Sequence, residues 1–410
     1  MKALELFAGA GGLGMGVALA GFKSVGVVEW DKWACDTIRA NQERGFPLVS
    51  DWPLHQGDIR DWIRSDEIRS LEGKVELVAG GPPCQPFSMG GKHRAFNDNR
   101  DMFPATVEVI SKIKPSAFIV ENVKGLTRSS FANYYQYIQL QLEFPEVNIA
   151  PDETWTKHLL RLQMEKSSGR RRVTGLTYNL LPSVVNAADF GIPQRRERVF
   201  IVGFRSDLDI QWHFPNETHS LDALLYDQWV SGEYWERHGI AMARRPRPPD
   251  TYRSRLDRLS SQFYQPVHHP WRTVRDALAT LPSPDTRNQG DNVLNHKFQP
   301  GARVYPGHTG SPLDLPAKTL KAGDHGVPGG ENMMVADDGA VRYFTVRESA
   351  RLQTFPDSYE LHGSWSEAMR QLGNAVPVSL AHFVAATVAA KLIHGEERRL
   401  KRGNRTEFVA

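Results

Sequence analysis

At 410 residues the chain is long enough for two or three domains, and with 40% apolar and 24% charged residues it can bury a core and is not a disordered polymer. Its 50 Lys and Arg nearly balance its 47 Asp and Glu, so the net charge of +3 does not by itself indicate a polyanionic partner. No apolar run approaches the length of a membrane span, and 2 cysteines without neighbouring ligand spacings exclude a disulfide framework and a zinc site, so we expect a cytoplasmic protein with no metal.

The first two hundred residues alternate short apolar runs with helical patterns, which is typical of α/β units. The predicted strands are residues 3–7, 25–29, 75–79, 117–121, 180–186 and 199–204. The predicted helices are residues 12–20, 32–41, 61–71 and 101–112. Near-continuous apolar strands between helices predict a Rossmann-like, doubly wound and mostly parallel sheet. The link between the last two strands is too short for a crossover helix, so we expect an antiparallel strand at one edge.

The second half of the chain has a different pattern. Residues 207–315 hold many Pro, Trp, His and Arg and few periodic segments, and irregular connections of that length are usually functional. Helices return at 346–352 and 378–392, and in the later one four apolar residues share a face: Leu380, Val384, Val388 and Leu392. We therefore expect a domain over residues 1–205, a small irregular one over 206–345, a return segment over 346–395 that completes the first, and a basic tail over 396–410.

Two internal stretches are rich in arginine. Residues 134–177 are polar and include three consecutive arginines. Between residues 244 and 275 arginines alternate with aromatic residues, and arginine is suited to bidentate contacts with phosphate and guanine. We expect this belt to bind nucleic acid. Its candidate contacts are Arg244, Arg245, Arg253 and Arg255.

A glycine turn follows the first predicted strand and opens the first helix. Gly9 and Gly11 allow the backbone to approach a ligand closely, and Glu29, at the end of the next strand, is placed to bind ribose hydroxyls. Trp30 is placed to stack on an adenine, and Asp58 to accept from an exocyclic amine. The pattern predicts a nucleoside cofactor and leaves its identity open, since a tight strand-to-helix turn would by itself explain the glycines.

Cys84 lies in a Gly-Pro-rich loop after the third predicted strand, at a sheet edge where ligands bind. The prolines fix the position of its sulfur, so we interpret Cys84 as a nucleophile, whereas Cys35, in mid-helix, is predicted to pack. Glu121 ends another apolar strand, where an acid is costly unless it is paired or functional. Arg196 and Arg198 open the last strand on one face, because alternate side chains of a strand point the same way.

Together these motifs resemble those of the DNA (cytosine-5) methyltransferases of bacterial restriction–modification systems. The matching segments, in family order and spacing over nearly the whole chain, are residues 7–12, 29–31, 57–59, 82–88, 121–123, 194–198, 347–353, 355–356 and 373–377. The resemblance makes 1–205 the S-adenosylmethionine-binding catalytic domain and 206–345 the target-recognition domain. Residues 134–177 depart from the family's pattern, and our hypothesis is that they form a surface insertion that touches the DNA flanks.

The resemblance implies methylation of cytosine carbon 5 in a specific double-stranded DNA sequence, with S-adenosylmethionine as donor and S-adenosylhomocysteine as product. Cys84 would add to carbon 6 of a flipped-out base, Glu121 would stabilise N3, Arg198 would bind O2, and Arg196 would lie near the thiol. The implied cofactor residues are Phe7, Gly9, Gly11, Glu29, Trp30, Asp58, Ile59, Asn374 and Val376. The implied DNA contacts are Gln85, Ser88 and Thr319, beside the four arginines of the belt.

The two-domain layout favours a monomer with a cognate restriction endonuclease as a functional but not physical partner. Three alternatives remain. A transfer-RNA cytosine-5 methyltransferase has little need for the long region 207–315. A catalytically silent DNA-binding module would be expected to have lost Cys84 or Glu121, and a nicotinamide dehydrogenase leaves the cysteine loop unexplained.

Overall fold

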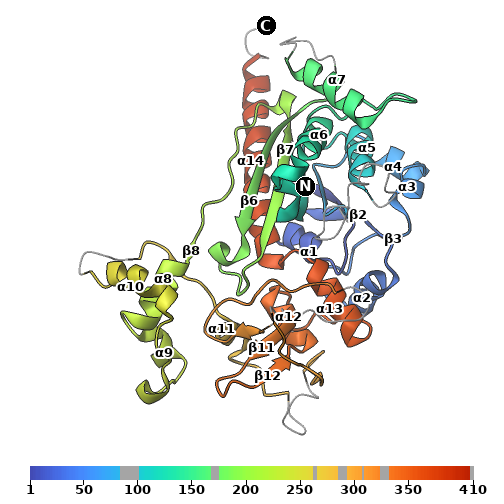
Figure 1. Ribbon diagram of the computed structural model, residues 1–410. Helices are drawn as coiled ribbons and strands as arrows, with labels where there is room; N and C mark the ends of the chain where they lie inside the picture. Colours follow the sequence, from blue (N-terminus) through green and yellow to red (C-terminus); the bar gives the residue numbers. More distant parts are fainter. Residues whose placement is uncertain are drawn as a thin grey trace. The chain divides into compact units, whose positions relative to one another are not determined.

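The computed structural model describes residues 1–83, 101–167, 175–261, 266–284, 293–306, 309–323 and 332–406, with side chains up to residue 397. The chain divides into two compact units (Figure 1). The first holds Met1–Val185, Glu197–Pro215 and Ala381–Ala410, and the second holds Asn186–Arg196 and Asn216–Leu380. Each unit is therefore built from segments that are distant in the sequence.

The first unit is built on a seven-stranded sheet in the order β3-β2-β1-β4-β5-β7-β6. Its strands are β1 (Lys2–Leu6), β2 (Lys23–Glu29), β3 (Leu54–Gln56), β4 (Leu77–Gly80), β5 (Ala117–Val123), β6 (Tyr178–Asn186) and β7 (Glu197–Arg205). Strands β3, β2, β1, β4 and β5 are parallel, and β7 is antiparallel to β5. This confirms the predicted doubly wound, mostly parallel sheet. Strand β3 was not predicted, because Leu-His-Gln is too short and too polar to give an apolar pattern.

In the part of this unit that the structure describes, seven helices lie between the strands along the chain. They are α1 (Gly12–Leu19), α2 (Lys32–Glu43), α3 (Ile59–Trp62), α4 (Asp66–Ser70), α5 (Phe103–Ile113), α6 (Ala132–Glu143) and α7 (Trp155–Ser167). The single helix predicted over 61–71 is wrong, since α3 and α4 replace it. Ser65 separates the two: its backbone is extended, with ψ 164°, and its hydroxyl donates to the carbonyl of Trp62 at 2.7 Å.

Helices α6 and α7 correct the expectation that 134–177 is a surface insertion throughout. The α6 residues Tyr134, Tyr137 and Ile138 are buried in the main core cluster. Buried His158 of α7 joins the two helices, since its Nδ1 lies 2.9 Å from the Tyr137 hydroxyl and its Nε2 lies 2.7 Å from the carbonyl of Val147. The sequence pattern did not reveal this face because tyrosines and glutamines are interspersed among its apolar residues.

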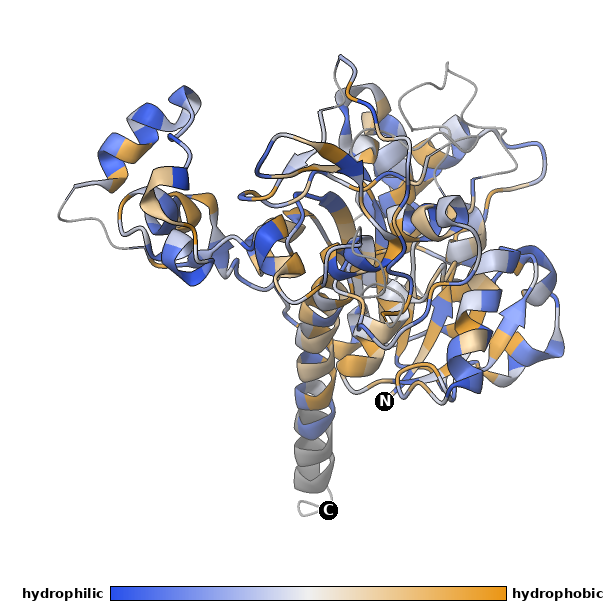
Figure 2. Cartoon of the chain, turned by 90° about the horizontal axis from the view of Figure 1, so that it is seen from below, coloured by the Kyte–Doolittle hydropathy of each residue, from blue (hydrophilic) through white to orange (hydrophobic). Residues whose placement is uncertain are grey.

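The last helix, α14 (Val378–Thr406), extends well beyond the predicted 378–392. Its four predicted apolar residues are all buried, and Figure 2 shows polar residues taking over only toward its C-terminal end. It packs against α1, because a Cβ on Gly16 would lie 2.4 Å from the Cβ of Ala381. In the described part of the chain one stretch, Trp365–Glu397, is long and apolar enough to cross a membrane by length and composition, and more than half of it is buried, as in the core helix of a water-soluble protein.

The second unit is assembled from short elements. Its helices are α8 (Leu221–Trp229), α9 (Glu233–Arg237), α10 (Arg253–Leu259), α11 (Val274–Leu278), α12 (Val346–Leu352) and α13 (Trp365–Asn374). Its strands are β8 (His219–Ser220), β9 (His269–Pro270), β10 (Ser311–Pro312), β11 (Met333–Val335) and β12 (Val341–Tyr343). Helix α12 has the predicted bounds, and Thr345 and Glu348 form a capping box at its start. Helices α8–α10 were not predicted, because each is too short to show a period.

Substituting Gly16→Ala should destabilise the first unit by about 1–3 kcal/mol, because the added Cβ would meet backbone as well as side-chain atoms of α14 at less than 3.0 Å. Thermal or guanidinium unfolding measures the effect. Gly395→Ala in α14 is the matched control, since its Cβ would meet only the Ile210 side chain at 3.3 Å. Equal stability of Gly16→Ala and the parent protein would contradict the packing of α1 on α14.

Candidate active site

The central strands of the sheet bring the predicted cofactor residues of the first unit and Glu121 to one edge. Strands β1 and β4 are parallel neighbours with Leu6 opposite Gly80, and the strand order reverses between them. In open α/β sheets ligands bind at such a switch point, beyond the carboxyl ends of the strands. The glycine turn leaves β1 here, Glu29 ends the adjacent β2, and Gly81 and Glu121 lie at the ends of β4 and β5.

The glycine turn has a backbone that non-glycine residues rarely adopt. Gly9 and Gly11 have φ of 54° and 84°, in the left-handed region, and Phe7 has φ 56° despite its side chain. In α1, which follows the glycine turn, a Cβ added to Gly14 would lie 1.7 Å from Oε2 of Glu5. The glycines therefore serve two purposes: they shape the turn, and they leave room for a buried carboxyl beneath it.

Glu29 fixes the turn to the end of β2. Its Oε2 accepts from the backbone N–H of Gly9 at 2.7 Å, and its Oε1 accepts from those of Trp30 and Asp31 at 2.8 and 2.7 Å. Burial raises its pKa, and these three donors act in the opposite direction. Because a carboxylate offers about four acceptor sites, roughly one is left for a ligand hydroxyl.

The other predicted cofactor residues of the first unit lie at the same edge. Trp30, directly after β2, is 73% exposed, which leaves its ring free to stack. Gly57, directly after β3, donates its N–H to the carbonyl of Glu29 at 2.9 Å, so Asp58 comes next along the edge. Asp58 caps α3 and accepts from Arg60 Nε at 2.9 Å, which lowers its pKa. Ile59 is buried.

The charges around the turn fit S-adenosylmethionine better than a dinucleotide. Residues 7–20 contain no Lys or Arg to neutralise a pyrophosphate. The carboxyl that contacts the turn is instead that of Glu29, whose Oε2 accepts from the N–H of Gly9. The Glu5 carboxyl is mostly neutral at pH 7, because burial raises its pKa to about 8. A sulfonium and an ammonium group are cations, and an acidic surround attracts them. Glu29 with its remaining acceptor site and the exposed Trp30 are the groups that would hold the adenosine part.

Glu121 and Arg198 form a buried ion pair on the antiparallel strands. Arg198 Nε lies 2.9 Å from Glu121 Oε1, and both side chains are at most 10% exposed. The strand register places Glu121 opposite Phe200 and Arg198 opposite Val123, so the pair is a diagonal one on the same face. Burial lowers the pKa of Arg198, and the Glu121 carboxylate opposes that shift.

The start of the cysteine loop is held against this pair. Asn122 Nδ2 donates to the carbonyl of Pro82 at 2.9 Å, and a Cβ on Gly81 would lie 3.1 Å from Glu121 Oε2. Pro82 and Gly81 lie two and three positions before Cys84 in the sequence. Cys84, Gln85 and Ser88 themselves lie outside the described residues, as do Arg170–Arg172. Cys35 is buried as predicted, and burial raises its pKa to about 12.

Arg196 lies in the second unit and is fully buried. Its guanidinium donates to three backbone carbonyls: Leu320 at 3.2 Å, Gly373 at 2.8 Å and Ala375 at 2.8 Å. It therefore holds the turn between α13 and α14, which carries Asn374 and Val376. A cofactor role for these two residues and a place for Arg196 near the thiol stay predictions.

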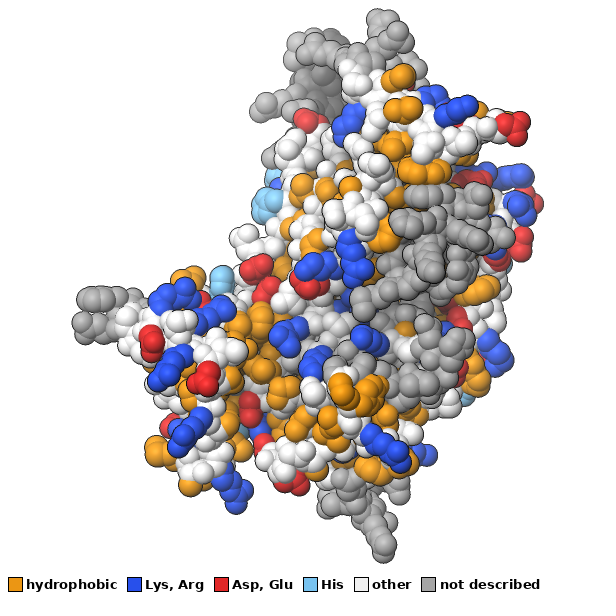
Figure 3. Space-filling view, in the orientation of Figure 1, with side chains coloured by type: hydrophobic (Ala, Val, Ile, Leu, Met, Phe, Trp, Pro, Cys, Tyr) orange, Lys and Arg blue, Asp and Glu red, His pale blue; other side chains and the backbone are white. Residues whose placement is uncertain are grey.

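The predicted DNA contacts of the second unit are mostly at the surface. Figure 3 shows Lys and Arg side chains over α8–α10. Arg244 and Arg253 are exposed, whereas Arg255 pairs with Asp222 and Arg245 lies 3.9 Å from Glu236. Thr319 Oγ1 donates to the carbonyl of Arg195 at 2.6 Å. No cluster of His, Cys, Asp and Glu able to hold a metal ion occurs among the described side chains.

Sequence reasoning overlooked Glu5. It is buried in mid-β1, where its Oε1 accepts from the N–H of Gly14 at 2.8 Å. Burial, with a smaller contribution from Glu29, raises its pKa to about 8. The signal was present in the sequence, since an acid within the apolar run 3–7 needs a partner or a function.

Comparison with known proteins gives a consistent match. A family model described as C-5 cytosine-specific DNA methylase matches residues 1–146 and 171–390. The type II methyltransferase M.PspPI of Psychrobacter sp. is 31% identical over 397 residues, covering 95% of this chain and 79% of its own. M.FnuDI of Fusobacterium nucleatum is 28% identical over 411 residues, covering 100% of both chains. The family model leaves residues 147–170 unmatched, so the insertion begins after α6 and includes α7.

Solved structures agree in fold. A candidate DNA modification methyltransferase encoded within an E. coli prophage superposes with a TM-score of 0.55 at 20% identity, over 96% of this chain and 99% of its own. The S. pombe Dnmt2 methyltransferase superposes with a TM-score of 0.51 at 16% identity, over 96% and 98%.

Substituting Glu5→Gln should change how stability depends on pH. A carboxyl with a pKa of about 8 in the folded chain and about 4.5 in the unfolded chain destabilises the fold progressively as pH rises between these values. The amide removes this loss, so the stability gain of Glu5→Gln should grow by up to about 1.4 kcal/mol per pH unit from pH 5 to 8. Guanidinium unfolding across this range measures it, with Glu43→Gln, at the exposed end of α2, as control. A gain that does not vary with pH would contradict the raised pKa.

Proposed function

The chain belongs to the C-5 cytosine-specific DNA methylase family and is a DNA (cytosine-5) methyltransferase, and we propose that it acts on one cytosine of a specific double-stranded sequence through a covalent adduct of Cys84. The buried Glu121–Arg198 pair carries this proposal. It lies where Asn122 holds the segment that leads to Cys84, at the same sheet edge as the glycine turn. An S-adenosylmethionine-type methyl donor follows from the family.

The chemistry starts from a poor nucleophile, carbon 5 of cytosine. Addition of the Cys84 thiolate to carbon 6 turns the ring into an enamine, whose carbon 5 can accept a methyl cation. Glu121, protonated, would donate to N3, where negative charge accumulates during addition, and Arg198 would bind O2. The bound donor supplies an electrophilic methyl group. A base then removes the proton from carbon 5, and elimination restores the ring double bond and frees the thiolate.

A stacked base offers neither face of carbon 6 to a thiolate. We therefore propose that the target cytosine flips out of the duplex toward Glu121 and Arg198 at this sheet edge. The exposed arginines Arg244 and Arg253 and the Thr319 segment are the proposed DNA contacts of the second unit. Residues 1–205 with the return segment 346–395 form the proposed catalytic domain, and 206–345 the target-recognition domain.

The biological setting that fits is a restriction–modification system of a bacterial cytoplasm. The relatives compared above carry the name type II methyltransferase. The proposed enzyme is a monomer that protects host DNA from a cognate endonuclease it does not need to bind.

The direct experiment incubates purified protein and S-adenosylmethionine with a plasmid library and reads the product by bisulfite sequencing. We expect methylation of one cytosine within one short sequence. Methyl transfer to transfer RNA and not to duplex DNA would overturn the proposal, as would methylation without sequence context.

Substituting Cys84→Ser should abolish turnover while leaving cofactor affinity near that of the parent, because an alkoxide is not available at neutral pH to add to carbon 6. Transfer of a tritium-labelled methyl group from the donor to duplex DNA measures turnover, and calorimetry measures cofactor binding. The matched control is Cys35→Ser, which changes the buried cysteine of α2. Full activity of Cys84→Ser would remove the adduct from the mechanism.

Substituting Glu29→Ala should raise the cofactor dissociation constant by about tenfold to a hundredfold, the value of one or two charge-assisted hydrogen bonds, and leave duplex affinity intact. Glu29→Gln, which keeps one acceptor oxygen, should give an intermediate loss. Isothermal calorimetry of both variants checks the order. An unchanged dissociation constant for Glu29→Ala would contradict the ribose assignment.

A further inference from the structure

A short segment of the second unit, residues 311–320, is held by polar contacts at two places. We call it the connecting segment. It begins at β10, passes beside α9 and α11, and ends beside residues 193–196, which lead directly into β7. The proposed function uses only its Thr319, and no step of that mechanism explains why the rest is anchored so firmly.

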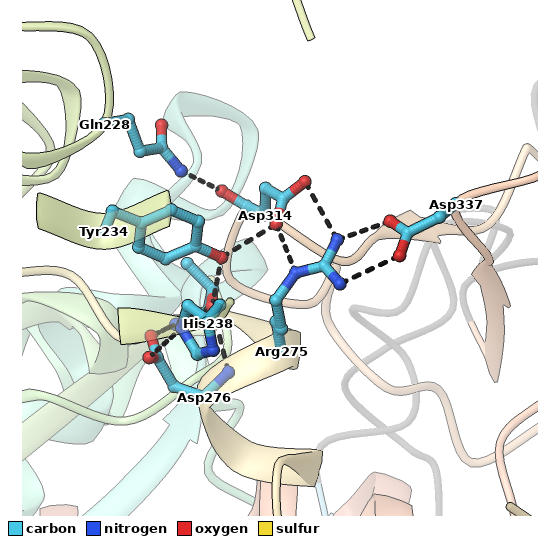
Figure 4. Close-up of polar contacts among 8 residues, drawn as sticks. Gln228, Tyr234, His238, Arg275, Asp276, Asp314 and Asp337 are labelled. Carbon is cyan, nitrogen blue, oxygen red and sulfur yellow. Dashed lines mark hydrogen bonds and ion pairs between the residues drawn. The ribbon is translucent and has the colours of Figure 1, made fainter. Parts of the chain in front are cut away.

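The first anchor is Asp314, shown in Figure 4. Its carboxylate accepts from the Tyr234 hydroxyl at 2.9 Å and from Arg275 Nε at 2.6 Å. Its backbone carbonyl accepts from Gln228 Nε2 at 2.6 Å. The neighbouring carbonyls of Leu313 and Leu315 accept from the backbone of α11 at 2.8 and 3.0 Å. One residue thus gathers donors from α8, α9 and α11.

Two of these donors are buried, and both depend on Asp314 as an acceptor. Tyr234 and Gln228 are at most 1% exposed. Burial and the nearby Asp314 carboxylate raise the pKa of Tyr234, so its hydroxyl stays a proton donor. A buried donor that loses its partner is costly, which favours one position of the segment over others.

The second anchor lies three to six residues further along. The backbone N–H of Ala317 donates to Pro193 at 2.9 Å, and that of Arg195 donates to Ala317 at 2.8 Å. Leu320 N–H donates to Gln194 Oε1 at 3.1 Å. Together with the Thr319 bond to Arg195, these contacts fix the connecting segment against residues 193–196.

We propose that Asp314 is a positioning residue, which couples recognition of DNA by α8–α11 to the rate of methyl transfer. By fixing the connecting segment, Asp314 sets the position of Thr319 and of residues 193–196, which continue into the strand that carries Arg198. The coupling runs through one continuous set of hydrogen bonds within the second unit. This inference rests on the proposed function.

Asp337 provides a matched control within the same network. It also pairs with Arg275, with Nη1 at 3.0 Å, but it lies in the turn between β11 and β12, is 64% exposed at its side chain and has no part in the connecting segment. Asp337→Asn and Asp314→Asn therefore remove the same charge from the same arginine, and only Asp314→Asn loosens the segment.

The experiment compares Asp314→Asn, Tyr234→Phe and Asp337→Asn on the duplex that bisulfite sequencing identifies. Single-turnover methyl transfer is measured on that duplex and on one with a single altered base pair, along with cofactor affinity, duplex affinity and thermal midpoint. We expect Asp314→Asn and Tyr234→Phe to slow methyl transfer on the correct duplex by about tenfold. The ratio of the transfer rates on the correct and the altered duplex should fall, and cofactor affinity should stay unchanged. Asp337→Asn should transfer methyl groups as the parent does.

Two outcomes would overturn the inference while the parent enzyme remains active. In the first, Asp314→Asn lowers the thermal midpoint without slowing transfer, which would make the anchor structural only. In the second, Asp337→Asn slows transfer as much as Asp314→Asn does, which would assign the effect to the charge of Arg275. Tyr234→Phe keeps the buried ring and decides the matter if Asp314→Asn does not fold. An inactive parent protein would instead count against the proposed function.

Discussion

The ion pair between Glu121 and Arg198 is the constraint on which the site depends. Two charges taken out of water are costly unless they meet in good geometry, so their burial at 2.9 Å ties the ends of β5 and β7 together. Only an antiparallel β7 places Arg198 diagonally across from Glu121 on one face. The reversed strand in a parallel sheet is thus the feature that brings an acid and an arginine to the position where the cysteine loop begins. Asn122 adds the contact that holds this loop at Pro82.

At the glycine turn, by contrast, carboxyl groups are held by backbone N–H groups and not by an arginine. Around the glycine turn the ionisable groups are the carboxyls of Glu5 and Glu29, and backbone N–H groups rather than cations donate hydrogen bonds to them. The Glu29 carboxylate accepts hydrogen bonds from three backbone N–H groups at the turn, which leaves about one acceptor site for a ligand. The Glu29 carboxyl at this turn is compatible with the cationic methyl donor that the family implies. Strand β4 lies between β1, which leads into the turn, and β5, which carries Glu121. In the proposed mechanism donor and base would therefore meet at the edge beyond these three strands.

Patterns over a few neighbouring residues predicted most strands of the sheet, because a buried strand of a parallel sheet is visible in the sequence as a short apolar run. The apolar runs gave β1, β2, β4, β5, β6 and β7, and the motifs at their ends located Glu29 and Glu121. Helix α6 was missed because tyrosines and a glutamine make up half of its buried face, and β3 because it is too short. The bond between Asn122 and Pro82 and the Asp314 network join residues 40 and 80 positions apart, and no periodicity reports such contacts. Glu5 was within reach, since an acid in an apolar strand is visible in the sequence.

In the proposed mechanism the sulfur of Cys84 attacks a flipped-out cytosine beside Glu121 and Arg198. A duplex carrying 5-fluorocytosine at the target position tests it most directly, because fluorine cannot leave carbon 5 as a proton does, and elimination is blocked. With the methyl donor present, mass spectrometry of the digested complex should find one DNA adduct per chain, on the peptide that contains residue 84. No adduct, or an adduct on another residue, would contradict the account.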